Sequence, residues 1–301
     1  MKLKYIFLTP LAAVLMTNSG SYAQESILAL EGPYMGQEPP GETAEVFAPG
    51  VISTEGWELQ AVFAPGMNEF YYVTNSGKHE RPKISEFKPT IIGYRLDDNR
   101  WHKFVEMPRT GEPFITADGQ TMHLAKGRRE RTASGWSDVK GLGPMFERED
   151  WGIMRLTAST AETYVFDDFR SASIRMSRVV DGERQEPLNL PEHINSGDFT
   201  AHPFIAPDES YLIWDSEREG GYGESDLYIS FRQADGAWGA AINMGPTVNS
   251  DKDDFYGSVT PDGKFLMFDR TISRTDDYID VDIYWVSAEV IETLRPKTQP
   301  R

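Results

Sequence analysis

One phrase recurs along the chain: an apolar run, a turn rich in Pro, Asp and Gly, and a second apolar run. The clearest copy starts at Gly257, turns at Pro261-Asp262-Gly263 and ends at Asp269. Proline presets φ for such a turn, and Asp-Gly tolerates the positive φ that joins twisted strands closely. Each copy therefore predicts a β-hairpin. The five copies occupy residues 60–73, 113–124, 154–167, 202–215 and 257–269.

Two further elements follow the hairpins. Residues 226–230 and 282–286 are short runs rich in β-branched and aromatic residues, which predicts a third strand. A fourth element is also repeated, because residues 238–246 align without gaps on residues 136–144, with looser copies at residues 101–108 and 187–191. Four strands per repeat, at a period of roughly 40 to 55 residues, are typical of β-propeller blades.

The two ends of the chain complete the pattern. The last repeat stops after its third strand, while residues 44–53 resemble the fourth element and precede the first hairpin. We therefore expect an all-β protein, a β-propeller of five four-stranded blades that is closed by an N-terminal strand. Closure of this kind buries strand edges that would otherwise be exposed. A sixth blade, concealed in residues 128–134, is the alternative.

The N-terminus has the pattern of a cleavable secretory signal. Lys2 and Lys4 precede an apolar run that ends at Met16, and small residues lead to Ala23. The run is about a dozen residues long, short of the roughly 20 that span a bilayer. We expect a periplasmic or secreted protein that does not insert into a membrane. The expected divisions are a signal peptide (1–23), an extended lead-in (24–43), a single propeller domain (44–294) and a polar tail (295–301).

Charge and cysteine content exclude several function classes. The chain has 301 residues, and its 30 Lys and Arg against 47 Asp and Glu give a formal net charge of -17. Such a field repels phosphate backbones, so we expect no nucleic-acid partner. The absence of cysteine excludes disulfides, thiolate metal sites and thiol nucleophiles.

The turns and third strands resemble those of a known family. Pro207-Asp208, the run 261–264, the run 225–228 and the stretch 238–250 are similar to the WD40-like (PD40) repeats of exported bacterial proteins related to the TolB propeller. The resemblance covers most of residues 44–290 and is strongest in the last two repeats. It implies a periplasmic binding or scaffold propeller, and it carries no catalytic motif.

Candidate site residues follow from aligning the repeats on the turn proline. By analogy with other propellers, the first strand of each blade lines a central channel, and ligands bind at one mouth of that channel. Two positions of this strand share a face. They predict a polar, mostly acidic mouth with the ligand-binding residues Glu58, Gln60, Glu112, His202, Asp254 and Tyr256. The structural alternative is that these side chains only hydrogen-bond between neighbouring blades.

We therefore expect a monomeric binding or scaffold module with no cofactor of its own. Its partner would be a cationic segment of an envelope protein or a small polar ligand, because an acidic face steers cations toward it. The alternative is a metal-dependent hydrolase or lyase of a sugar or lactone, in which His202 converges with Glu58, Glu112 and Asp254 on a divalent ion. Calcium is considered because acidic residues cluster at 251–254 and 276–282.

Overall fold

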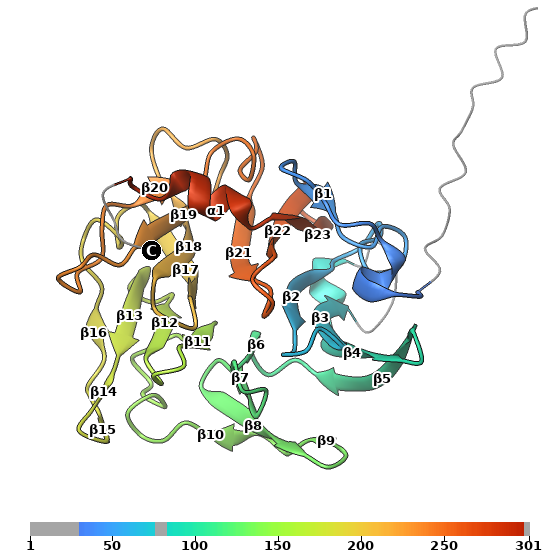
Figure 1. Ribbon diagram of the computed structural model, residues 1–301, viewed down its shortest axis with the longest axis horizontal. Helices are drawn as coiled ribbons and strands as arrows, with labels where there is room; N and C mark the ends of the chain where they lie inside the picture. The colour runs from blue at the N-terminus through green and yellow to red at the C-terminus, as the bar shows by residue number, and fades with distance from the viewer. Residues whose placement is uncertain (1–29, 76–82, 298–301) are drawn as a thin grey trace, which may run out of the picture.

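The computed structural model describes residues 30–75 and 83–297. Five four-stranded antiparallel blades stand around a central channel, with the first strand of each blade innermost (Figure 1). Blade 1 contains β2 (Leu59–Phe63), β3 (Glu69–Asn75), β4 (Pro89–Asp97) and β5 (Arg100–Pro108). Blade 2 contains β6 (Pro113–Ile115), β7 (Thr121–Leu124), β8 (Gly127–Thr132) and β10 (Lys140–Gly141), and β9 (Gly135–Trp136) also pairs with β8. The predicted all-β propeller is confirmed.

The last three blades follow the same order. Blade 3 contains β11 (Leu156–Ala158), β12 (Tyr164–Asp168), β13 (Ser173–Ser177) and β16 (Leu188–Asn189), with the small hairpin β14 (Val179–Val180) and β15 (Glu183–Arg184) inserted. Blade 4 contains β17 (Phe199–Ile205), β18 (Tyr211–Glu217), β19 (Asp226–Phe231) and β20 (Ile242–Asn243). Blade 5 contains β21 (Asp254–Val259), β22 (Phe265–Arg274), β23 (Ile279–Ser287) and β1 (Glu45–Val46).

The N-terminal strand closes the ring, as the repeat pattern predicted. β1 pairs antiparallel with β23 beside blade 1 (Figure 1). In this pair Glu45 lies opposite Trp285. Phe47, which directly follows β1, is fully buried and packs its ring against Phe63 and Phe70 of blade 1 and against Trp285. Closure therefore joins blade 5 to blade 1 both by strand pairing and by an aromatic cluster.

The alternative of a sixth blade is not realised, because most of residues 128–134 belong to β8, the third strand of blade 2. Short helical segments lie outside the blades: η1 (Pro33–Gly36), η2 (Ile84–Glu86) and α1 (Glu289–Leu294). Met35 of η1 is fully buried, and α1 buries Val290 and Ile291. Within the described ranges, every helix is too short or too polar to cross a membrane. The expected signal peptide lies outside the described residues.

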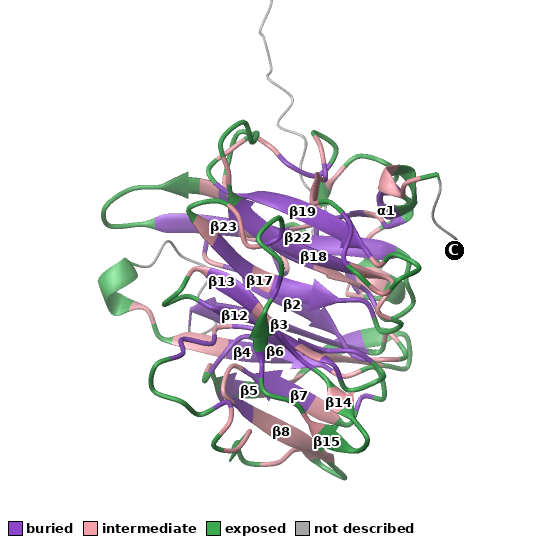
Figure 2. Ribbon diagram, turned by 90° about the vertical axis from the view of Figure 1, so that its left-hand side faces the viewer, coloured by how far each residue is buried: buried purple, intermediate pink, exposed green. Residues whose placement is uncertain are grey.

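Apolar side chains between the blades form the core. One cluster joins Ile213 and Leu227 of blade 4 to Leu266 and Phe268 of blade 5. The inner strands are buried along most of their length, whereas the outer strands carry more exposed residues (Figure 2). Because the second strand of each blade packs against the neighbouring blades on both of its faces, both faces carry apolar residues. The same close packing holds the first strands in place around the channel.

Candidate functional site

Three buried aspartates join successive blades. Asp167, Asp215 and Asp269 occupy the same place near the end of the second apolar run in blades 3, 4 and 5. Each accepts a backbone N–H from the first strand of the next blade: His202 N at 3.0 Å, Tyr256 N at 3.0 Å and Gln60 N at 2.8 Å. We call them the latch aspartates.

The N–H groups that the latches bind belong to β-bulges. The register of β2, β17 and β21 shifts around Gln60, His202 and Tyr256, which have φ values of 61°, 46° and 58°. Non-glycine residues rarely adopt this left-handed conformation, and bulges redirect side chains next to functional sites. The bulges therefore free a backbone donor for the preceding blade at the level where the sequence predicted a site.

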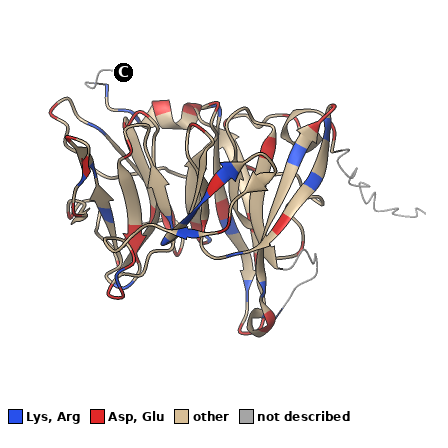
Figure 3. Ribbon diagram, turned by 90° about the horizontal axis from the view of Figure 1, so that it is seen from below, with Lys and Arg blue, Asp and Glu red and all other residues tan. Residues whose placement is uncertain are grey.

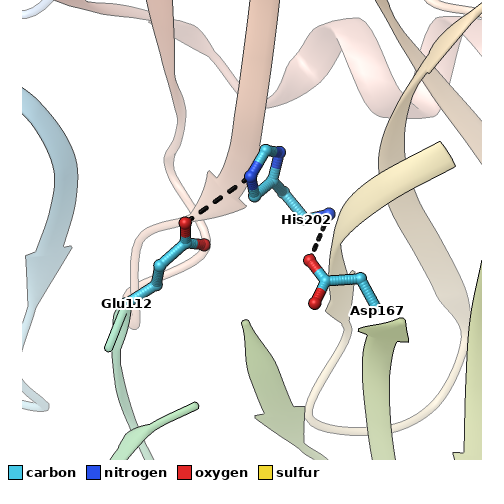
Figure 4. A group of neighbouring side chains, drawn as sticks. All are labelled: Glu112, Asp167 and His202. Carbon is cyan, nitrogen blue, oxygen red and sulfur yellow. Dashed lines mark hydrogen bonds and ion pairs between the residues drawn. The ribbon is translucent and has the colours of Figure 1, made fainter. Parts of the chain in front are cut away.

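His202 lies between two carboxylates. Its Nδ1 bonds to Asp215 at 2.9 Å and 3.1 Å. On the other side of the ring, its Nε2 lies 3.6 Å from Oε1 of Glu112 (Figure 4). Arg109 joins the same group, because Nη2 donates to Glu112 at 3.1 Å and Nε donates to the side chain of Gln60 at 3.1 Å. The structure thus brings together three predicted site residues, Gln60, Glu112 and His202.

The charges in this group support one another. Burial alone lowers the pKa of His202, but the carboxylates of Asp215 and Glu112 outweigh burial and raise that pKa well above its ordinary 6.5. Burial raises the pKa of Glu112, yet His202, Arg109 and Arg155 together bring it below the usual value. His202 is therefore an imidazolium at neutral pH, held by two carboxylates.

Two side chains cross the channel beside this group. Arg155 is fully buried; its Nη1 donates to the carbonyl oxygens of His202 and Gly257, both at 3.1 Å, and its guanidinium lies 3.7 Å from the ring centre of Tyr256. The Tyr256 hydroxyl donates to the carbonyl oxygen of Pro113 at 2.7 Å. Blades 3 and 5 thus reach across to the other blades.

Sequence reasoning did not identify Arg155. In the aligned repeats it stands one residue after the predicted level, where the other blades have Ala61, Pro113, Pro203 and Gly257. The sequence does show one unusual feature here, because a long, positively charged side chain stands where the other repeats have Ala, Pro or Gly. The Arg155 side chain extends to blades 4 and 5, where it bonds to the carbonyl oxygens of His202 and Gly257.

Glu58 and Asp254 are not part of this group. Glu58 accepts the backbone N–H and the hydroxyl of Thr54, at 3.0 Å and 3.1 Å. Asp254 accepts the same two donors from Ser250 and also pairs with Arg270. In the described part of the chain no hydrogen bond or ion pair joins either residue to His202 or Glu112. These two carboxylates thus hold the backbone that leads into the first strands of blades 1 and 5.

The predicted mouth is more closed than the sequence suggested. Glu58, Gln60, Glu112, Asp254 and Tyr256 are all buried, and only His202 is partly accessible. Acidic and basic residues are interspersed around the ring (Figure 3). The acidic side chains at the channel are thus paired or hydrogen-bonded inside the protein.

Glu112, Asp167 and His202 are also the group that could hold a metal ion, because one ligand atom from each lies within 4.8 Å of the others. The fit is poor. Asp167 already accepts backbone N–H groups from Met154, Arg155 and His202. Two arginines lie beside Glu112, and a metal would have to displace the proton of His202. The arrangement matches an internal ion network better than a metal centre.

A pocket of about 550 Å³ opens at the end of the channel where the first hairpin turns lie. All five blades contribute to its lining. Its walls are apolar and its rim polar; the wall residues include Val62, Phe114, Ile115, Ala158, Phe204 and Val259, and the rim residues include Tyr34, Tyr211, Asp262 and Lys264. Arg155, which is fully buried, is also part of the lining. The sequence predicted these turns from their backbone preferences and placed no candidate site residue in them.

The fold and this pocket define the class of protein, a five-bladed β-propeller with a largely apolar pocket at one channel mouth. Comparison with family models finds no match, and no curated protein matches by sequence.

Solved structures with a similar fold include TolB from Acinetobacter baumannii, at 15% identity, 77% coverage of this chain, 57% of TolB and a TM-score of 0.43. Xyloglucan PUL GH43B from Bacteroides ovatus has 12% identity, coverage of 81% and 54%, and a TM-score of 0.47. Hydrazine synthase from Kuenenia stuttgartiensis has 13% identity, coverage of 73% and 58%, and a TM-score of 0.40. The chain thus spans little more than half the length of these proteins, and the similarity concerns the fold alone.

Proposed function

We propose that this chain is an exported propeller of the PD40 type that binds a small ligand in the pocket at the hairpin-turn mouth. The observation that carries the proposal is the pocket itself. Its volume of about 550 Å³ lies within the range of roughly 300 to 1,000 Å³ that small-molecule sites occupy, and its apolar walls with a few polar groups are typical of them.

The ring makes such a site rigid. Each blade supplies lining residues from the end of its first strand or from the following turn. The latch aspartates fix the first strands of blades 4, 5 and 1, and apolar packing between the blades supports the ring. A pocket that is already formed binds without the cost of ordering its walls. The secretory pattern at the N-terminus and the repeated Pro-Asp turns support export and PD40 membership.

The other expected functions have less support. A cationic protein segment would need accessible acidic groups at the channel, but these are buried and already bonded. A metal-dependent hydrolase or lyase would need Glu58 and Asp254 beside His202, and both have other partners. Binding of a small ligand by a monomeric propeller is therefore the proposal to test.

The test is titration of the purified protein with the neutral apolar fluorophore N-phenyl-1-naphthylamine. We expect saturable one-to-one binding. Ala117 lines the pocket rim and is exposed, so Ala117→Trp should narrow the opening and weaken binding at least tenfold. The matched control is Ala234→Trp, at an exposed turn that does not line this pocket, which should bind like wild type. Equal binding by Ala117→Trp, or no saturable binding at all, would refute the proposal.

A further inference from the structure

We propose that Arg155 receives the carboxylate of the ligand, so that the pocket selects small monocarboxylic acids with an apolar body. This inference rests on the proposed function, and it adds the chemical class of the ligand. It starts from the hydrogen-bonding groups of one buried side chain.

The guanidinium of Arg155 uses only one of its nitrogens. Nη1 donates to two backbone carbonyl oxygens, whereas Nε and Nη2 are buried and have no partner among the described residues. Buried donors are almost always satisfied, because a buried donor without a partner loses its hydration and gains no hydrogen bond in return. Two free donors on a single buried cation therefore call for a ligand.

The two free nitrogens lie on the same edge of the planar guanidinium. This is the edge that pairs with a carboxylate through two parallel N–H···O bonds, an arrangement that is stronger and more directional than a single contact. Lysine offers no equivalent fork. The free edge thus specifies a planar oxyanion rather than a lone acceptor.

The surroundings of Arg155 specify the rest of the ligand. Arg155 is fully buried and lines the pocket together with the apolar residues Val62, Phe114 and Phe204. A carboxylate taken into such walls without a cation loses its hydration and is disfavoured. A ligand with its carboxylate at Arg155 and an apolar body along the walls satisfies both parts of the pocket.

Internal carboxylates are the competing partners for this edge. Oε2 of Glu112 and Oδ1 of Asp269 are also buried without a partner, and the charge of Arg155 affects the pKa of both groups. If they satisfied the free edge through a small rearrangement, Arg155 would be structural and the pocket would have no preference for acids. The two arrangements differ in a measurable way.

The test compares 4-phenylbutyrate, octanoate and the neutral 4-phenylbutan-1-ol by calorimetric titration of the purified protein. We expect at least tenfold tighter binding of 4-phenylbutyrate than of the alcohol. Arg155→Gln should abolish that preference while the alcohol still binds, and Arg155→Lys should restore only part of it. The affinity of octanoate relative to 4-phenylbutyrate shows whether the pocket prefers aliphatic or aromatic acids.

The matched control is Arg175→Gln, which removes a blade 3 arginine that pairs with Asp168 and does not line the pocket. It should keep the preference. Equal affinities of acid and alcohol in wild type would overturn the assignment of Arg155 and leave the proposed pocket standing. Failure of both compounds and of the neutral fluorophore would overturn the proposed function as well.

A second measurement covers the case in which the Arg155 variants do not fold. In wild type, the pKa of ¹³C-labelled 4-phenylbutyrate can be followed by NMR in the free and bound states. Contact with a guanidinium lowers that pKa on binding, whereas burial against apolar walls alone raises it. A raised pKa would refute the contact with Arg155 without any mutation.

Discussion

The latch aspartates allow a matched pair of substitutions at equivalent positions of two blades. Asp215→Asn keeps an oxygen that can accept the backbone N–H of Tyr256 but removes the charge that faces His202 at 2.9 Å. Asp269→Asn makes the same change in the next blade, where the carboxyl accepts the N–H of Gln60. We expect the two variants to differ strongly in the free energy of unfolding.

The magnitude follows from the charges. At 2.9 Å and an effective dielectric constant of about 20, the attraction between Asp215 and the imidazolium of His202 is about 6 kcal/mol. His202 can release its proton once Asp215 is neutral, which limits the loss. We expect Asp215→Asn to cost about 3 to 5 kcal/mol, as is usual when one partner of a buried ion pair is removed.

Asp269 provides the control because burial raises its pKa well above the usual value. Burial disfavours the charged form of this carboxyl in the folded state, so Asp269→Asn should change the free energy of unfolding by no more than about 1 kcal/mol, since a hydrogen bond to the backbone is kept. Urea unfolding at pH 7, followed by tryptophan fluorescence and by circular dichroism, measures both variants.

The pH dependence gives a second check on the same pair. The folded-state pKa of His202 is raised, so its contribution to stability is fully present below about pH 6.5 and is lost as pH rises through the folded-state pKa. The gap between wild type and Asp215→Asn should therefore narrow at high pH. Equal losses from both substitutions, or a gap that does not depend on pH, would refute the assignment of a charged His202.

Two other predictions concern the remaining carboxylates. Burial raises the pKa of Glu58 from 4.5 to about 7, so this carboxyl ionises at lower pH in the unfolded chain than in the folded one. The folded state therefore loses about 3 kcal/mol of stability as pH rises from 4.5 to 7. Glu58→Gln should remove that loss, and parallel pH profiles of wild type and variant in urea titrations would contradict it. Calcium, zinc, manganese or EDTA should move the thermal midpoint by less than about 1 °C, because His202 and two arginines already neutralise Glu112, and Asp167 already accepts three backbone N–H groups. A metal at about 100 times its dissociation constant would add about 2.7 kcal/mol and shift the midpoint by several degrees, which would restore the metal hypothesis.

The repeat determined the architecture without any tertiary information. Pro261-Asp262-Gly263 and its copies specify a hairpin through local backbone preferences, and the spacing of third and fourth strands specifies the blade. Even ring closure followed from counting, because the last repeat lacks a strand that residues 44–53 can supply. These features are local or periodic, so a single sequence is enough to show them.

The sequence also placed Gln60, Glu112 and His202 at one level of the channel, because a strand repeats every two residues. It could not show that Glu58 and Asp254, two residues earlier in the aligned strands, bond within their own blades. That choice depends on which hydroxyl and N–H groups the preceding turn presents, and the turns differ between blades.

Only the tertiary structure decided which part of the channel is filled by a buried ion network and which part forms the pocket. The strand alternation that predicted the polar level is interrupted by bulges at Gln60, His202 and Tyr256, and these depend on latch aspartates that lie 35 to 209 residues away in sequence. The crossing of Arg155 and Tyr256 likewise depends on carbonyl groups of other blades. Sequence periodicity shows which face of a strand points inward. The side-chain contacts inside the channel, however, involve residues of all five blades, and these contacts are not encoded by any local sequence pattern.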